Sequence, residues 1–239
     1  MNVREILQSR LPYDVSGADR LPGVQALDPA QWLIRDEAFA GQMAYRDALI
    51  STRRDDVLAL RPEAEAAARE LLSLVLAEAY PDVATNQVRR ADGRVVTIDD
   101  TDPMATLGRI VQEDFCILQK QQDEHALTGA ILCFPANWRL AEKIGRGLVG
   151  IHDPVDPYDD NIARRVQRLF DGVQVGRPLW RCNALRYDDP DLFQPNRVAP
   201  RHGRYLRSER QTLRRLPDTR AVVFGIHTFV LDVEDKASA

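Results

Sequence analysis

Apolar residues follow a helical spacing in the first third of the chain and a strand-like spacing afterwards. The segment from Pro62 to about Ala79 is rich in Ala, Glu and Leu and ends at Tyr80-Pro81, which predicts a helix. An earlier helix is predicted to begin at Asp28-Pro29, with Asp as its cap and Pro at its first position, and apolar residues continue at helical spacing to Ile50. Residues 1–90 are therefore predicted to be mostly helical, after an extended, proline-interrupted arm.

Residues 91–239 are predicted to contain the sheet. The runs Phe115–Leu118 and Leu127–Phe134 flank a polar loop, Gln119–Ala126, as in an antiparallel hairpin. Further strands are expected at Leu179–Leu185 and Ala221–Leu231, and a helix is expected to begin at Asp159 or Asp160. Together these elements predict an α+β fold, and we expect residues 1–239 to form one domain.

Tyr205–Pro217 contains a carboxylate among apolar positions. If this segment is helical, Glu209 falls on the same stripe as Leu206 and Leu213. A buried carboxylate must find a partner or raise its pKa. Two explanations stay open for Glu209: a role in a site, or a structural salt bridge to a nearby arginine, namely Arg207, Arg210, Arg214 or Arg215.

His152 is the best ligand candidate among the four histidines. It stands between Ile151 and the rigid Asp153-Pro154, so its backbone is restrained, although a histidine there can also serve only to cap a turn. His227 is a weaker candidate because a strand residue can face solvent. His125 and His202 are predicted to lie in polar loops.

Gly145–Gly150 matches the G-x-G-x-x-G pattern of dinucleotide-binding folds. That pattern requires a preceding strand and a following helix. Here a charged, helix-like segment precedes the glycines, and Ile151–Pro157 is not expected to begin a helix. We therefore do not predict nicotinamide binding.

Composition narrows the functional classes. The formal net charge of -4 gives no reason to expect nucleic acid or an anionic membrane as a partner. No apolar run approaches the roughly 20 residues of a membrane span, and the amino terminus does not resemble a signal peptide, so a cytoplasmic protein is expected. The three cysteines form no C-x-x-C pair, which argues against a cysteine metal cage.

Two charged groups allow either of two interpretations. Glu113-Asp114 is an acid pair at a helix end or in a loop, or only a solvated charge pair, and the arginines of the helix after residue 160 are a solvated face or a dock for an acidic partner. Those arginines are Arg164, Arg165 and Arg168.

A series of motifs, specific in order and spacing, resembles the haem-dependent oxidative N-demethylase family from about Leu21 to Leu231. The motifs are Glu113–Phe115, Cys133–Trp138, Lys143–Gly145, Ile151–Val155, Arg181–Asn183 and Leu206–Pro217. One departure is Ala184, where the family is expected to carry an aromatic residue after the asparagine.

The resemblance implies a PAS-like fold, a curved antiparallel sheet with packed helices, that binds haem b. It implies that dioxygen and electrons remove a methyl group from a small secondary or tertiary amine and release formaldehyde. The electrons would come from a flavin and iron–sulfur reductase on a separate chain.

The residue roles that follow from the resemblance are equally specific. His152 would be the proximal iron ligand, and Glu209 a distal acid that relays protons or binds an ammonium-type substrate. Arg207 and Arg210 would pair with haem propionates. The aromatic residues Phe134 and Trp138 would line the pocket. The alternatives are a haem-binding PAS-type sensor without turnover and a small-molecule-binding subunit without haem.

Overall fold

The computed structural model describes residues 3–16, 18, 23–83, 85–152, 160–196 and 203–233, and the side chains of residues 152 and 160–163 lie outside this description. Its main feature is an antiparallel sheet of seven strands in the order β1-β7-β8-β9-β5-β6-β2, accompanied by a separate two-stranded ribbon, β3-β4. The fold is therefore α+β, as the sequence predicts.

Long strands occupy the centre of the sheet and short ones its edges. The central strands are β7 (Leu179–Tyr187), β8 (Tyr205–Arg215), β9 (Val222–Asp232), β5 (Asp114–Gln121) and β6 (Glu124–Ile131). The edge strands are β1 (Gln25–Ala26) and β2 (Leu58–Leu60), and the ribbon consists of β3 (Gln87–Arg89) and β4 (Val95–Thr97). The first third of the chain thus supplies both edges of a sheet whose centre comes from the last two thirds.

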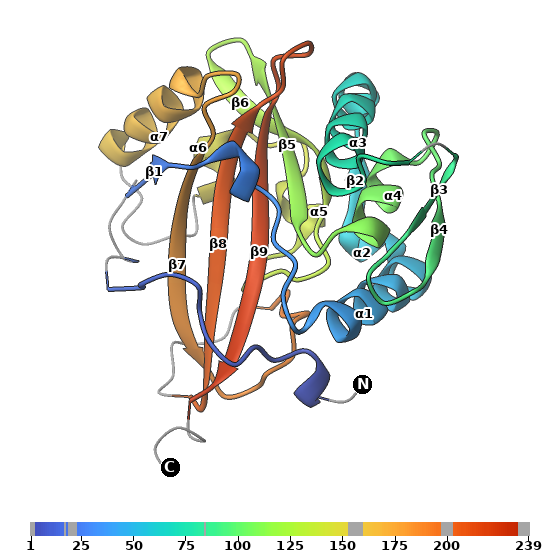
Figure 1. The fold of residues 1–239 in the computed structure, drawn as a ribbon. Coiled ribbons are helices and arrows are strands. Elements are labelled where there is room, and N and C mark those ends of the chain that lie inside the picture. The colour runs from blue at the N-terminus through green and yellow to red at the C-terminus, as the bar shows by residue number, and fades with distance from the viewer. Residues whose placement is uncertain are drawn as a thin grey trace.

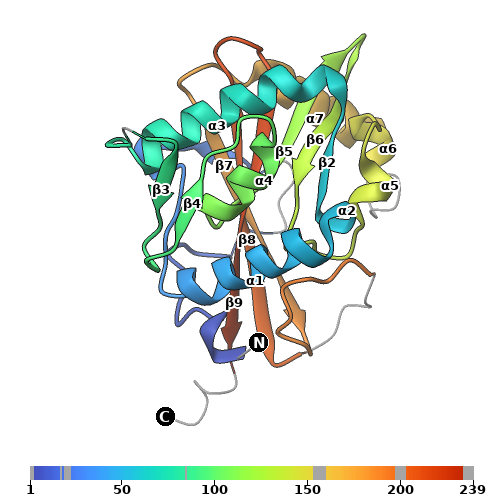
Figure 2. The ribbon, with the colours of Figure 1, turned by 90° about the vertical axis from the view of Figure 1, so that its right-hand side faces the viewer.

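Helices cover the sheet in separate groups. The α-helices are α1 (Phe39–Thr52), α2 (Arg54–Val57), α3 (Glu65–Ala79), α4 (Pro103–Ile110), α5 (Leu140–Lys143), α6 (Leu148–His152) and α7 (Asp160–Gly172), and short 3-10 turns occupy Val3–Glu5, Pro29–Gln31 and Pro62–Ala64. In Figure 1 the N-terminal arm crosses in front of β7, β8 and β9, whereas α1, α3 and α4 lie beside β5. Figure 2 shows α5 and α6 on the side of the sheet opposite to the arm.

Two apolar clusters fill the space between these layers. The larger contains Trp32, Phe115 and Phe134 and extends under α1, α3 and α4. The smaller contains Leu148, Leu213 and Ile226 and joins the sheet to α5, α6 and α7. We call the side of β7–β9 that faces the smaller cluster the helix face, and the opposite side, crossed by the N-terminal segment, the arm face.

Most predicted elements are confirmed. The predicted hairpin is β5 and β6, and the predicted Pro62–Ala79 helix is a 3-10 turn followed by α3. The strands predicted at Leu179–Leu185 and Ala221–Leu231 are β7 and β9. The helix predicted from Asp28 is divided into a 3-10 turn, capped by the Asp28 side chain, and α1. Among the described residues, no helix has the length and apolar character needed to cross a membrane.

Several local predictions are wrong. Tyr205–Arg215 is a strand and not the helix considered above, because it pairs with β9 along its whole length and with β7 from Tyr205 to Leu213. A short helix that the sequence does not predict, α6, begins inside the glycine pattern at Leu148 and ends at His152. His125 lies in β6, where it is buried and not in a polar loop. His202 lies outside the described residues.

The acid pair Glu113-Asp114 is buried and not solvated. Asp114 forms an ion pair of 2.7 Å with Arg46 of α1 and accepts hydrogen bonds from the main-chain nitrogens of Cys133 and Phe134. This carboxylate therefore fixes the point where the chain leaves β6 towards α5.

Candidate functional site

Alternation along β8 decides which polar side chains share a face of the sheet. Residues at odd positions, including Glu209 and Leu213, point to the helix face, whereas Arg210 and its even-numbered neighbours point to the arm face. Because directly paired residues in an antiparallel sheet lie on one side, Asn183 of β7 and Thr228 of β9 flank Glu209 on the helix face.

Glu209 is 6% exposed, and one of its carboxylate oxygens holds two donors. The side-chain nitrogens of Asn183 and Gln211 each donate to Oε2 over 2.9 Å. The main-chain nitrogen of Glu209 donates to Asn183 Oδ1, also over 2.9 Å. The second oxygen, Oε1, has the Nη2 atom of Arg207 at 4.0 Å. The carboxylate is thus oriented through Oε2, which leaves Oε1 available to another molecule.

Arg207 is held by main-chain carbonyls. Its Nη1 and Nη2 atoms donate to the carbonyl oxygens of Leu192 and Phe134 over 3.0 and 2.8 Å, and the guanidinium lies 5.7 Å from the centre of the Tyr187 ring. The Tyr187 hydroxyl accepts a hydrogen bond of 2.9 Å from Asn137. Burial raises the pKa of Tyr187, so this phenol stays protonated at neutral pH.

Next to Glu209 on the helix face, Arg207 Nε and Thr228 Oγ1 are buried donors without a partner in the described part of the chain. Native proteins usually satisfy such groups with protein, water or ligand atoms. Their position beside Glu209 is therefore typical of a site that receives a polar ligand.

The α6 helix lies over this face and is attached at both ends. Glu124, the first residue of β6, accepts a 2.5 Å hydrogen bond from the main-chain nitrogen of Val149, and Lys143 donates to the carbonyl oxygen of Ile151. Leu148 and Ile151 pack in the same cluster as Leu213 and Ile226 of the sheet. The backbone that carries His152 is therefore fixed against the helix face.

The glycine pattern serves this attachment. Gly145, with φ of 79°, and Arg146 pair with Leu127 of β6 through main-chain hydrogen bonds. A Cβ atom on Gly147 would lie 2.1 Å from Glu124 Oε2, so a larger residue here would have to displace the Glu124 carboxylate. These glycines position α6 by close backbone contacts.

The structure brings some of the proposed site residues together and separates others. Glu209 and Arg207 share the helix face, Trp138 packs half-buried in its apolar cluster, and α6 carries His152. The Phe134 ring instead packs in the larger cluster, 5.9 Å from Tyr45 of α1. The side chain of His152 lies outside the described residues.

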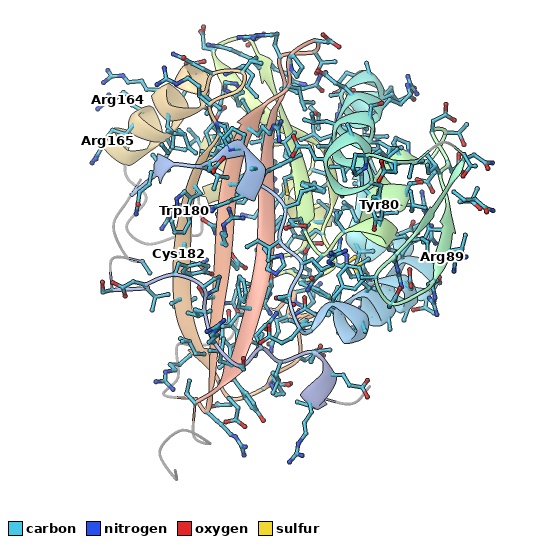
Figure 3. The ribbon with its side chains drawn as sticks, in the orientation of Figure 1. Tyr80, Arg89, Arg164, Arg165, Trp180 and Cys182 are labelled. Carbon is cyan, nitrogen blue, oxygen red and sulfur yellow. The ribbon has the colours of Figure 1, made fainter. Side chains whose placement is uncertain are left out.

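Arg210 lies on the arm face and is separated from Glu209 by the sheet. Its guanidinium donates to the carbonyl oxygens of Trp32 and Gln31 over 3.1 and 2.5 Å. Trp180 and Cys182, labelled on β7 in Figure 3, belong to this face because they pair with Thr212 and Arg210. Arg210 therefore secures the N-terminal segment and is not grouped with Arg207.

A second buried polar cluster occupies the arm face. The His227 ring contacts the carboxylates of Asp36 and Glu113, with Nε2 3.1 Å from Asp36 Oδ2 and Nδ1 3.2 Å from Glu113 Oε1. Burial lowers the pKa of His227, but the two carboxylates outweigh it and raise this pKa to about 9. Burial likewise acts to raise the pKa of Asp36, yet hydrogen bonds from His227, Gln112 and Gln8 bring it below its ordinary value.

The family model of the haem-dependent oxidative N-demethylase, alpha subunit-like proteins matches residues 23–238, nearly the whole chain. The chain belongs to this family. The matched range includes both polar clusters, all seven strands of the main sheet and the three helices of the helix face.

Family membership indicates a haem-dependent, oxidative type of function. Across the described residues, no three His, Cys, Asp or Glu side chains are arranged to hold a metal ion, so the protein side chains placed here form no separate metal site. All three cysteines are free thiols.

Sequence reasoning missed the residues that orient Glu209. Asn183 and Gln211 become visible only when Tyr205–Arg215 is interpreted as a strand, because Gln211 is then two residues along the same face. Thr228 had no signal of its own, since its closeness to Glu209 depends on the pairing of β8 with β9.

Proposed function

We propose that the protein catalyses haem-dependent oxidative N-demethylation of a small secondary or tertiary amine and releases formaldehyde. Dioxygen is the oxidant, and a separate flavin and iron–sulfur reductase supplies the electrons. The observation that carries the proposal is Glu209, an oriented and nearly inaccessible carboxylate on the helix face of a chain from this family. A carboxylate in such a place is suited to proton transfer or to binding a cationic amine.

The residues of the helix face fit haem b. Leu148, Ile151, Leu213 and Ile226 form an apolar layer between α6 and the sheet whose chemistry suits a porphyrin, and the unpartnered donors Arg207 Nε and Thr228 Oγ1 would offer hydrogen bonds to its polar groups or ligands. This layer, between a sheet and a helix that carries a histidine, agrees with the proposed PAS-like fold. His152 would supply the axial imidazole.

When bound, haem would supply the activation of dioxygen and the transfer of electrons. The protein residues have the remaining tasks. Asn183 and Gln211 fix Oε2 of Glu209, so that Oε1 can hold an ammonium group or pass a proton. Trp138 would exclude water from one side of the layer, and Arg207 would offer Nε to a propionate, since its Nη1 and Nη2 atoms already bind carbonyls.

The test is an absorption spectrum of the protein after addition of haem, with and without dithionite, beside that of His152→Ala. We expect a Soret band in the wild type that shifts on reduction and that weakens or moves in the variant, because the axial imidazole is gone. His125→Ala is the matched control, since His125 hydrogen bonds to Gln167 and should leave the band unchanged.

Addition of candidate amines then tests catalysis. Amine-dependent oxygen consumption with formaldehyde release supports the demethylase. A haem protein with no turnover in the presence of a competent reductase would instead be a sensor, and failure of the wild type to bind stoichiometric haem would reject the proposal.

A further inference from the structure

The hydroxyl of Thr228 is a buried donor for which the fold itself gives no use. Thr228 is 2% exposed, and its Oγ1 atom has no hydrogen-bond partner among the described residues. A buried, unsatisfied hydroxyl is unfavourable, and valine would fill the same space without that cost. A threonine at such a position indicates that a bound molecule completes the hydrogen bond.

The position of Thr228 identifies the carboxylate with which it acts. Its Cα is the direct pairing partner of Glu209, so both side chains stand on the helix face with Cβ atoms about 5 Å apart. Oε2 of Glu209 is occupied by Asn183 and Gln211, whereas Oε1 has Arg207 Nη2 at 4.0 Å. Oε1 and the Thr228 hydroxyl therefore belong to directly paired residues on the same face of the sheet.

We propose that Glu209 and Thr228 form an acid–alcohol pair that delivers protons to dioxygen as it is reduced. This inference rests on the proposed function and adds Thr228 as a catalytic residue. The Thr228 hydroxyl binds an oxygen atom of dioxygen and gives that atom a proton as dioxygen is reduced. It then regains a proton from the Glu209 carboxyl, directly or through one water, and bulk water returns a proton to Glu209. Both side chains end unchanged, and the electrons come from the reductase.

The test compares two substitutions at one position in the haem-loaded protein. Thr228→Val keeps the shape and removes the donor, whereas Thr228→Ser keeps the donor. The matched control is Thr212→Val, since Thr212 is an equally buried strand threonine on the arm face whose hydroxyl lies 3.5 Å from the carbonyl oxygen of Gly225.

The first measurement is fluoride binding to the ferric protein, which reports a hydrogen-bond donor without any turnover. Loss of one donor should weaken fluoride binding about tenfold in Thr228→Val, with Thr228→Ser within about threefold of wild type and Thr212→Val unchanged. The second measurement is formaldehyde released per dioxygen consumed, which should fall in Thr228→Val and recover in Thr228→Ser.

The outcomes distinguish failure of the acid–alcohol pair from failure of the proposed function. Wild-type fluoride affinity and coupling in Thr228→Val would overturn the acid–alcohol pair and leave the proposed function standing. A wild type that binds no haem rejects both. If Thr228→Val does not fold, Thr228→Ala removes the same hydroxyl with less bulk and carries the same comparison.

Discussion

Glu209 differs from an ordinary buried carboxylate because its partners are neutral amides. Two amide nitrogens bind Oε2, and the nearest cation, on Arg207, stands 4.0 Å from Oε1. A carboxylate retained only for stability would be expected to form a closer pair with its arginine, since a bidentate ion pair is the stronger arrangement. The loose contact with Arg207 therefore favours a role towards a ligand.

Glu209→Gln should separate chemistry from folding. The glutamine amide oxygen can still accept from Asn183 and Gln211, so stability should change by less than about 1 kcal/mol, while loss of the acid should lower turnover about 100-fold. Steady-state formaldehyde release and thermal unfolding measure the two effects. Glu113→Gln, on the arm face, is the control and should retain turnover; undiminished turnover in Glu209→Gln would remove this residue from the mechanism.

For single residues, the sequence predicts the need of a side chain for a partner better than it predicts which residues contact that side chain. The expectation that Glu209 is buried and needs a partner is met: two amides donate to Oε2, and of the four arginines considered Arg207 forms a long ion pair of 4.0 Å with Oε1. From the sequence His227 is a weak ligand candidate because a strand residue can face solvent, yet it is 1% exposed between two acids. Asp36 and Glu113 are 191 and 114 residues from His227, so no local pattern could have indicated the contact.

Among the elements, β8 shows why local propensity was misleading. Leu, Arg, Gln and Glu favour helices, and Leu206 and Leu213 are spaced by two helical turns. The segment is nevertheless a central strand, because non-local pairing with β7 and β9 on both sides stabilises it more than intrinsic preference does. Elements with one dominant period, such as α3 and β9, were predicted correctly.

The same strand also caps a helix. Arg215, the last residue of β8, donates to the carbonyl oxygens of Phe170 and Val173 over 2.6 and 2.5 Å, at the C-terminal end of α7. Carbonyls there have no partner within the helix, and a cation is favourable at that end. We infer that Arg215 sets the position of α7 beside α6.

Arg215→Met should therefore loosen α7. Loss of these charged hydrogen bonds should cost about 2 kcal/mol, and amide hydrogen exchange should accelerate in residues 164–172 before other regions. Arg165→Met is the control, because Arg165 is exposed and points outward from α7 in Figure 3. Lower stability without faster exchange in α7 would show that the effect of Arg215 arises elsewhere.

At the scale of the whole molecule, the N-terminal segment packs against the arm face of the sheet and contacts β9. The segment before α1 brings Asp36 to His227 of β9. Gln8 exchanges hydrogen bonds with the main-chain nitrogen and carbonyl oxygen of Val230 and donates to the Asp36 carboxylate. Glu113 lies directly before β5. The α+β class and most elements were predictable from periodicity. That both sheet edges come from the first third was not, because strands of two or three residues carry no periodic signal.

This closure predicts a pH dependence of folding. His227 has a pKa of about 9 in the folded protein and about 6.5 when unfolded. The protonated His227 therefore contributes on the order of 3 kcal/mol to the free energy of unfolding. This contribution is fully present below pH 6.5 and is lost as the pH rises through 9. His227→Gln removes the titrating ring, so urea unfolding between pH 6.5 and 9.5 should show a smaller fall in the free energy of unfolding than in the wild type.

The control for this measurement is His125→Gln. Burial lowers the pKa of His125, so that this ring is neutral in both folded and unfolded states above pH 7.5 and its removal should leave the slope unchanged. Thiols and phenols whose pKa is raised by burial, including those of Cys133 and Tyr13, also destabilise the fold at high pH, but equally in all three proteins. The difference between the wild type and His227→Gln therefore isolates the ring that joins the arm to the sheet. Identical slopes in these two proteins would mean that His227 is neutral in the fold, and that the arm is held by the amide hydrogen bonds of Gln8 and the guanidinium of Arg210.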